Sequence, residues 1–169
     1  MRLIYRARQL LAALTARVTE ADLAEADDCL PEMARALFRR TPRDAQAHAL
    51  RVMRHLKRAG HAHPSLLAAA LLHDAGKSAA RITPLHRSLF VVIRHFAPAI
   101  LGRLPATETH RPLVALRDHA RIGAEWARAA GCDELTVRLI ARHPERVNGP
   151  ALTEEDRLLR ALQEVDDRN

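Results

Sequence analysis

Apolar residues recur along most of the chain at intervals of three and four positions, the spacing that lines one face of an α-helix. The clearest case is "RDAQAHALRVMRHLKRAG", which predicts an amphipathic helix from about residue 44 to 59 that ends before Gly60. No segment shows a convincing alternation of apolar and polar residues, the period of a half-buried strand. The pattern therefore predicts an all-α protein. The inner face of this helix is expected to carry Ala45, Ala49, Val52, Met53 and Leu56.

Proline and glycine residues interrupt the helical pattern and divide the chain into roughly eight predicted helices. Thr19 or Asp22 is expected to cap the second helix, and Thr153 the last. The helix that starts at Pro31 is expected to carry Met33, Leu37 and Phe38 on one face. The predicted helices cover about residues 3–19, 22–28, 31–40, 44–59, 64–74, 86–104 (one helix, or two interrupted at Pro98), 112–130, 133–143 and 153–169.

The stretch "PSLLAAALLHD" is apolar on all sides, which is typical of a helix at the centre of a bundle. A chain of 169 residues is long enough for one domain with a sizeable core. We therefore expect a single compact helical bundle.

This central helix ends in an adjacent imidazole and carboxylate, His73 and Asp74, which are followed by Gly76 and Lys77. Neighbouring residues of a helix point about 100° apart, so both side chains reach one ion only where the end of the helix faces it. A buried carboxylate is costly unless it is paired or bound to a metal. The sequence therefore predicts a metal site here, with further ligands from other helices.

Four more residues of ligand type follow or interrupt apolar stripes, so their side chains are expected to face inward. They are His48, His119, His143 and Asp166. The apolar phase of the last helix favours Asp166 over Asp167. Mixed nitrogen and oxygen ligands suit one or two divalent transition-metal ions, such as Mn, Fe, Co, Ni or Zn.

The order of these motifs resembles the HD-domain superfamily of metal-dependent phosphohydrolases. The pattern of that superfamily is a histidine, a His-Asp pair and a distant aspartate, here His48 in "AQAHALRV", the pair in "LLHDAGK" and Asp166 in "LQEVDDRN". His119 in "RDHARIGAEWARAAG" and His143 in "LIARHPE" match the extra histidines of members with two metals. The resemblance extends from about residue 44 to the end of the chain. It implies a metal-binding helical core of residues 44–169, with the helices of residues 1–43 packed on it.

The resemblance implies that Asp74 bridges two metals, with His48, His73 and Asp166 on one and two histidines, His119 and His143, on the other. It further implies phosphohydrolase or phosphodiesterase activity on a nucleotide or another small phosphoester, through a water activated by the metals. The Gly-Tyr-Pro signature of cyclic-di-GMP phosphodiesterases is missing, and so is the Glu-Asp pair that (p)ppGpp hydrolases carry soon after the His-Asp motif. Neither substrate is therefore carried over.

Other charged residues are weaker candidates for the reaction. Lys77 is expected to stabilise charge on a phosphoryl oxygen, unless it is a surface lysine. Arg81, Arg87 and Arg121 are candidates for binding substrate phosphates, or they are solvated residues of helix faces. Asp118 either orients the histidine that follows it or is a solvated helix residue.

The charge of the chain fits a phosphorylated partner but does not require one. The formal net charge is +7, and all of the 27 basic residues except Lys57 and Lys77 are arginines. This excess either attracts phosphate or belongs to solvated helix faces. Nucleic acid is disfavoured because few aromatic residues are available for base stacking. Two alternatives to a hydrolase stay open, namely an HD-type di-iron oxygenase and a non-catalytic metal-binding or ligand-binding signalling module.

The remaining features concern the compartment. Cys29 and Cys132 stand alone in the sequence, which predicts free thiols in a reducing cytoplasm. No apolar run approaches the ~20 residues that span a bilayer, and the start of the chain is too interrupted for a secretory signal. We therefore expect a cytoplasmic protein without a membrane partner; its oligomeric state is left open.

Overall fold

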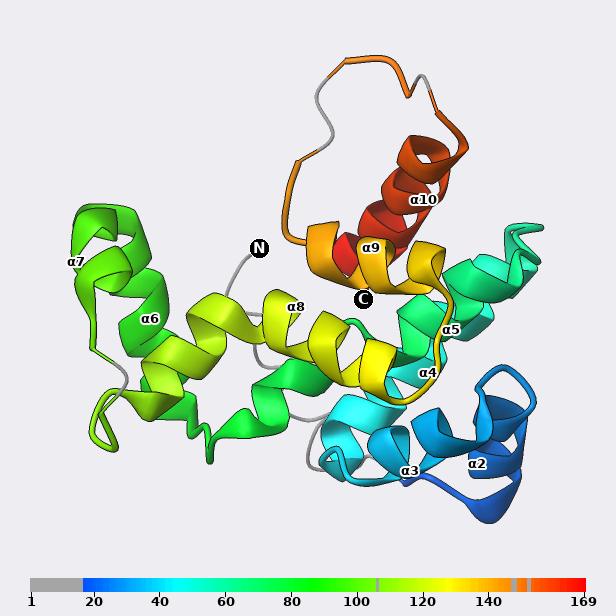
Figure 1. The fold of residues 1–169 in the computed structure, drawn as a ribbon, viewed down its shortest axis with the longest axis horizontal. Coiled ribbons are helices and arrows are strands. Elements are labelled where there is room, and N and C mark those ends of the chain that lie inside the picture. Colours follow the sequence, from blue (N-terminus) through cyan, green and yellow to red (C-terminus); the bar gives the residue numbers. More distant parts are fainter. Residues whose placement is uncertain (1–16, 106, 147–148, 152) are drawn as a thin grey trace.

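The computed structural model describes residues 17–105, 107–146, 149–151 and 153–169, and in these ranges the chain is all-α (Figure 1). They contain nine α-helices and one 3₁₀-helix and no strand. The prediction of an all-α bundle is therefore confirmed. The α-helices are α2 (Glu20–Asp27), α3 (Glu32–Arg39), α4 (Arg43–Arg58), α5 (Pro64–Leu72), α6 (Pro84–Phe96), α7 (Pro98–Arg103), α8 (Arg111–Ala129), α9 (Glu134–Arg142) and α10 (Glu154–Arg168), and the 3₁₀-helix is η1 (Ala75–Ala79).

Helix α5 forms the centre of the bundle, as its uniformly apolar sequence predicts. Every residue from Ser65 to Leu72 is buried. Pro64 occupies the first turn, where its missing N–H costs nothing, and the His63 ring accepts a hydrogen bond from the Ser65 N–H. Helices α4, α9 and α10 pack around α5. This packing carries the end of α5 into the interior of the protein.

Helices α2 and α3 extend the same hydrophobic core. Thr19 caps α2 in a reciprocal capping box with Asp22, and Ala34 and Phe38 bury one side of α3 against the core. The expected helix from residue 3 lies almost entirely outside the described residues, and residues 17–19 are not helical. The expectation that Met33 shares one face with Phe38 is wrong. The Met33 side chain is 66% exposed, because the packing face of α3 runs through Ala34 and Phe38, about 100° and 140° away around the helix.

Helices α6 and α7 form a lobe that lies apart from the other helices (Figure 1). The apolar segment of residues 86–104 is broken before Pro98, so it forms two helices rather than one. The long helix α8 runs from this lobe to the body of the protein (Figure 1). Arg117 of α8 fixes the lobe by donating a hydrogen bond of 2.7 Å to the carbonyl oxygen of Leu101.

The backbone of η1 approaches α8 very closely at Gly76. A Cβ atom at this position would lie 2.0 Å from the carbonyl oxygen of His119 and 2.7 Å from the backbone nitrogen of Gly123. Only glycine fits such a contact. The contact holds the residues that follow His73 and Asp74 directly against the part of α8 that carries His119.

The expected cellular compartment was based on the two cysteines and on the length of the apolar runs, and the structure describes both features in the ranges given above. Cys29 and Cys132 are both free, and burial raises the pKa of the Cys132 thiol to about 11, which makes it unreactive. Within the described ranges, none of the helices combines the length and the apolar character needed to cross a bilayer.

Candidate metal centre

Six side chains that the sequence singled out come together inside the bundle. They are carried by α4, the end of α5, α8, the end of α9 and α10, so they span almost the whole length of the chain. The ends of two buried helices contribute because an apolar helix carries its terminal residue into the core. These side chains are His48, His73, Asp74, His119, His143 and Asp166.

One group of ligand atoms forms between α4, α5 and α10. The Nε2 atom of His48 lies 2.9 Å from Oδ1 of Asp166. The Nε2 atom of His73 lies 3.6 Å from the same carboxylate oxygen and 3.7 Å from Oδ2 of Asp74. Two imidazoles and two carboxylates thus face one small volume.

A second group forms on the other side of Asp74. Oδ1 of Asp74 lies 3.7 Å from Nε2 of His119 and 3.8 Å from Nε2 of His143. The two Nε2 atoms lie 3.2 Å apart. In the described residues, His48, His73 and Asp74 make one set of potential ligands and Asp74, His119 and His143 make another. Asp74 is the residue that the two sets share.

Three of the four imidazoles are oriented in the same way by the backbone. In each, Nδ1 lies within hydrogen-bond distance of the carbonyl oxygen three residues earlier, so Nδ1 carries the proton and Nε2 presents its lone pair to the cluster. Metal-binding histidines are commonly fixed in this manner. The distances are 3.0 Å from His73 to Ala70, 2.9 Å from His119 to Leu116 and 2.7 Å from His143 to Ile140.

The Nε2 atom of His73 tests whether a cation fits this arrangement. The side chain is 1% exposed, and Nε2 has no hydrogen-bond partner among the described residues. A buried polar atom without a partner is costly, and such atoms are rare in folded proteins. Carboxylate oxygens of Asp74 and Asp166 lie within 3.7 Å of it. A divalent cation shared by the imidazole and the carboxylates fits this donor set.

Burial and charge act on the histidines in opposite directions. Burial lowers the pKa of His143 to about 3 and also lowers the pKa of His119, so both rings are neutral at neutral pH. Burial also disfavours the charged form of His73. The negative charges of Asp74 and Asp166 outweigh this effect and raise the pKa of His73.

The carboxylates of the cluster stay ionised in spite of their burial. Burial by itself would raise the pKa of Asp74, but the charge and hydrogen bond of Lys77, together with the neighbouring His73 and His119, outweigh it and hold the pKa well below the usual range. Burial acts on Asp166 in the same sense. The nearby rings of His48, at 2.9 Å, and His73, at 3.6 Å, outweigh it and lower the pKa of Asp166. The cluster therefore presents two negative charges beside the neutral rings of His119 and His143, which suits a cation.

Two aspartates next to the cluster have other partners. Asp167 is largely exposed and forms an ion pair with Arg146 at 2.6 Å, so Asp166 is the one that faces the histidines. Asp118 receives two hydrogen bonds from Arg117, at 2.7 and 2.9 Å, and does not hold the ring of His119.

The cluster opens onto a cleft of about 1040 Å³. His48, Asp74 and Asp166 lie on its wall, and so does Lys77, whose Nζ is 2.6 Å from Oδ2 of Asp74. Arg81 and Arg87 also reach the cleft. The cleft is therefore cationic around a core of carboxylates.

The arginines that line this cleft differ in part from those that the sequence predicted to bind substrate phosphates. Arg121 is not part of its wall: the guanidinium pairs with Glu125 at 2.7 Å. Three further arginines, which no motif in the sequence marks as phosphate ligands, also line the cleft: Arg40, Arg51 and Arg168. Only Arg51 could have been predicted from the sequence to line the cleft, because it follows His48 by three residues and therefore lies on the same face of α4.

The comparisons with known proteins agree with this geometry. A family model described as the HD domain matches residues 46–167, which is most of the chain. The chain belongs to the HD domain family, whose members are generally metal-dependent hydrolases that bind divalent ions. Neither the curated proteins nor the solved structures gave a match.

Proposed function

We propose that the chain is a metal-dependent phosphohydrolase that acts on a nucleotide or another small phosphoester. The observation that carries the proposal is the position of the histidine–aspartate cluster on the wall of a cationic cleft. Phosphoesters are anions at neutral pH, and guanidinium groups bind phosphate oxygens through paired hydrogen bonds. A cleft of about 1040 Å³ has room for a ligand the size of a nucleotide.

The two sets of ligands are proposed to hold divalent ions, with Asp74 in common. Asp166, which lies within 3.6 Å of two histidine nitrogens, completes the set that contains His48 and His73. Imidazole and carboxylate ligands suit Mn, Fe, Co, Ni or Zn. When bound there, such ions polarise a phosphoryl oxygen and make water a nucleophile at neutral pH.

The surrounding cations are proposed to bind and orient the substrate. The ammonium of Lys77 touches Asp74, so a phosphoryl group placed beside Asp74 is within its reach. Charge that grows on a phosphoryl oxygen in the transition state is stabilised there. Arg51, Arg81 and Arg87 lie on the same cleft and would hold the remaining phosphate oxygens. No protein nucleophile is required in this scheme.

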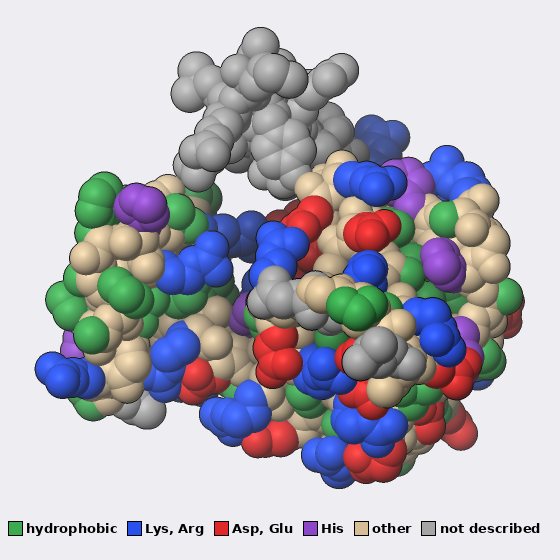
Figure 2. Space-filling model, turned by 90° about the horizontal axis from the view of Figure 1, so that it is seen from above, with side chains coloured by type: hydrophobic (Ala, Val, Ile, Leu, Met, Phe, Trp, Pro, Cys, Tyr) green, Lys and Arg blue, Asp and Glu red, His purple; other side chains and the backbone are tan. Residues whose placement is uncertain are grey.

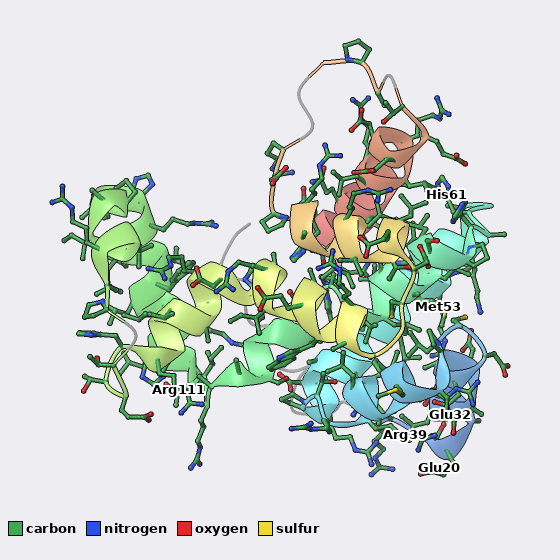
Figure 3. The ribbon with its side chains drawn as sticks, in the orientation of Figure 1. Glu20, Glu32, Arg39, Met53, His61 and Arg111 are labelled. Atoms are coloured by element: carbon green, nitrogen blue, oxygen red, sulfur yellow. The ribbon has the colours of Figure 1, made fainter. Side chains whose placement is uncertain are left out.

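An activity panel tests the proposal. The protein is loaded separately with Mn, Fe, Co, Ni or Zn and assayed on nucleoside mono-, di- and triphosphates, cyclic nucleotides and a synthetic phosphodiester. We expect hydrolysis of at least one compound, lowered at least about 100-fold by His73→Ala. His61→Ala is the matched control, because His61 lies in the turn between α4 and α5 and is not part of the cluster (Figure 3).

Two results would contradict the proposal. One is intact metal binding without hydrolysis of any phosphoester, which would leave a non-catalytic binding module. The other is dioxygen consumption by the iron-loaded protein without phosphoester hydrolysis, which would assign the same ligands to a di-iron oxygenase.

A further inference from the structure

Most of the large apolar side chains that are exposed in the described ranges belong to the α6–α7 lobe, and Met33 is the exception. On α6, Leu85, Leu89, Val92 and Phe96 follow one another at intervals of four, three and four, so they form one stripe along the helix. Their exposed fractions are 75%, 44%, 52% and 78%. This is a continuous apolar face, since scattered exposed residues would not share one side of a helix.

The stripe is not the face that packs against the rest of the protein. Helix α6 contacts α7 and α8 through a different side, on which His86, Phe90 and Ile93 are half-buried. No residue of α6 is fully buried. Ile100 of α7, 53% exposed, adds to the apolar surface of the lobe. Hydrophobic side chains are visible over this lobe, which stands at the left in Figure 2.

The charge of the lobe is of one sign. From residue 75 to residue 107 the sequence contains no aspartate or glutamate, while arginine occurs at Arg81, Arg87, Arg94 and Arg103. On α6, Arg87 and Arg94 lie about 200° around the helix from members of the stripe, so they occupy the opposite side. An apolar face opposite a basic face is the pattern of helices that lie in the interface of anionic membranes.

We propose that the α6–α7 lobe docks on a membrane surface that contains anionic phospholipids, with the stripe inserted at the level of the headgroups. The expectation of no membrane partner was based on the lack of an apolar run of spanning length, but a helix that lies on the surface needs only one apolar face. Pairing of two lobes is less favourable, because each lobe carries positive charge and no carboxylate of its own. In the described ranges, Arg87 is the one arginine of the lobe that lies near a carboxylate of the bundle, Asp44, at 3.9 Å. The proposal uses none of the cluster residues and does not depend on the proposed function.

Vesicle binding by the full chain tests the proposal. We expect the protein to sediment with vesicles of phosphatidylglycerol and phosphatidylcholine in equal parts, and to bind vesicles of phosphatidylcholine alone at least about tenfold more weakly. The double variant Val92→Asp and Phe96→Asp should lose at least about tenfold in affinity. Met33→Asp, an equally exposed apolar residue outside the lobe, should bind like the unchanged protein.

The charge of the lobe has its own matched control. Arg94→Glu with Arg103→Glu should weaken binding to the anionic vesicles by at least about 25-fold, since each arginine near such a surface contributes about fivefold. Arg58→Glu with Arg157→Glu changes the net charge by the same amount outside the lobe and should have a much smaller effect. Binding should also fall as the salt concentration rises.

The depth at which the apolar stripe of α6 enters the bilayer distinguishes docking through this stripe from electrostatic attraction alone. In Phe96→Trp the new indole should be quenched by vesicles made with brominated lipid, while in Met33→Trp it should not. Three results would overturn the proposal: no sedimentation with anionic vesicles, equal binding of the lobe and control variants, or a dimer in solution that Val92→Asp and Phe96→Asp dissociates. The last would assign the stripe to a second copy of the chain.

Discussion

The Nε2 atoms of His119 and His143 lie 3.2 Å apart, and each ring is bound through its other nitrogen to a backbone carbonyl. With the proton on Nδ1 of both rings, two lone pairs face each other across this distance. The nearest carboxylate oxygen, from Asp74, lies 3.7 and 3.8 Å away. Such an arrangement is unfavourable without a cation, so this pair is the part of the cluster that depends most on a bound ion.

The first prediction concerns the number of ions. In His143→Ala we expect the set of ligands around His119 to lose more than about 100-fold in metal affinity, which exceeds the usual effect of a residue that only orients a ligand. The set around His48 should keep its ion. Elemental analysis of the purified protein should therefore give about half the metal per chain.

The control for this experiment is His95→Ala, since His95 is exposed on α6 and should leave the metal content unchanged. Equal metal content in His143→Ala and in the unchanged protein would show that the second set of ligands does not hold an ion.

The second prediction concerns the residue that both sets share. Metal at about 100 times its dissociation constant stabilises a folded protein by about 2.7 kcal/mol, which raises the unfolding midpoint of a chain of this size by about 5–10 °C. In Asp74→Asn we expect this rise to disappear, because the variant removes a negative charge next to both sets of histidines. The measurement is thermal unfolding of chelator-treated protein with and without added metal.

Asp167→Asn provides the matched comparison, because Asp167 is the neighbour of Asp166 but pairs with Arg146 at the surface. Its midpoint should rise with metal as in the unchanged protein. A full rise in Asp74→Asn would exclude Asp74 as a shared ligand.

The third prediction tests the close approach of η1 to α8. In Gly76→Ala the new Cβ would lie 2.0 Å from the carbonyl oxygen of His119, and neither backbone has a flexible side chain that can yield. We expect a loss of about 3 kcal/mol or more in the free energy of unfolding, together with weaker metal binding because His119 is displaced. Urea unfolding and metal titration measure the two effects.

Gly102→Ala is the control on an exposed helix. Nothing lies within 4 Å of its Cβ position, so alanine should leave stability unchanged or raise it by up to about 1 kcal/mol through helix propensity. Similar stability losses in both variants would attribute the effect of Gly76→Ala to glycine replacement in general and not to the contact with α8.

The features that the sequence predicted well are those that local pattern determines. Helix α5 is apolar on every side, and a helix of that kind has only one stable place, the middle of the bundle. His73 and Asp74 follow it directly, so their arrival in the core was a consequence of the same pattern. The inward positions of His48 and Asp166 followed in the same way from the apolar stripes of α4 and α10.

The features that the sequence did not predict depend on contacts between distant segments. Arg40 and Arg168 meet at one cleft although most of the chain separates them, and in a sequence so rich in arginine no local signal marks them. Met33 shows the same limit on a smaller scale, because a periodic pattern allows more than one packing face. The apolar stripe of α6 predicts a helix equally well whether or not another element covers it.

The fourth prediction concerns acid stability. Hydrogen bonds from Arg54 and Thr19 lower the pKa of the Asp22 carboxyl to about 2. Because this is below the ordinary value of about 3.9, the stabilisation is fully present above about pH 4 and is lost as the pH falls through about 2. The difference in free energy of unfolding between the unchanged protein and Asp22→Asn should therefore be constant near neutral pH and vanish toward pH 2.

The size of this difference should not exceed about 1 kcal/mol, since Arg54 is partly exposed and the pair is screened by solvent. Urea unfolding at a series of pH values measures it. In an Arg54→Met background the effect of Asp22→Asn should shrink by more than half. A difference that persists unchanged at pH 2 would mean that shape and not charge makes Asp22 important.

The fifth prediction concerns a buried amide that joins α3 to α4. Nε2 of Gln46 lies 3.3, 3.0 and 2.9 Å from the carbonyl oxygens of Phe38, Arg39 and Thr41, and the side chain is only 2% exposed. These carbonyls stand at the end of α3, where a helix leaves acceptors without partners. In Gln46→Met we expect a loss of about 1–3 kcal/mol in the free energy of unfolding.

Gln46→Glu has nearly the same shape as glutamine but replaces the donor by a carboxylate that faces three carbonyl oxygens. At neutral pH it should destabilise the protein more than Gln46→Met, because a buried negative charge that faces these carbonyl oxygens is added to the lost hydrogen bonds. The exposed Arg43, which donates a hydrogen bond of 3.2 Å to Oε1 of Gln46, offsets only part of this cost. At lower pH, protonation gives the carboxyl an O–H donor, so the deficit of Gln46→Glu should shrink while that of Gln46→Met changes little. Urea unfolding of both variants at pH 7 and pH 5 measures this. A deficit of Gln46→Glu that is the same at both pH values would mean that the amide of Gln46 acts by filling space and not by donating to the end of α3.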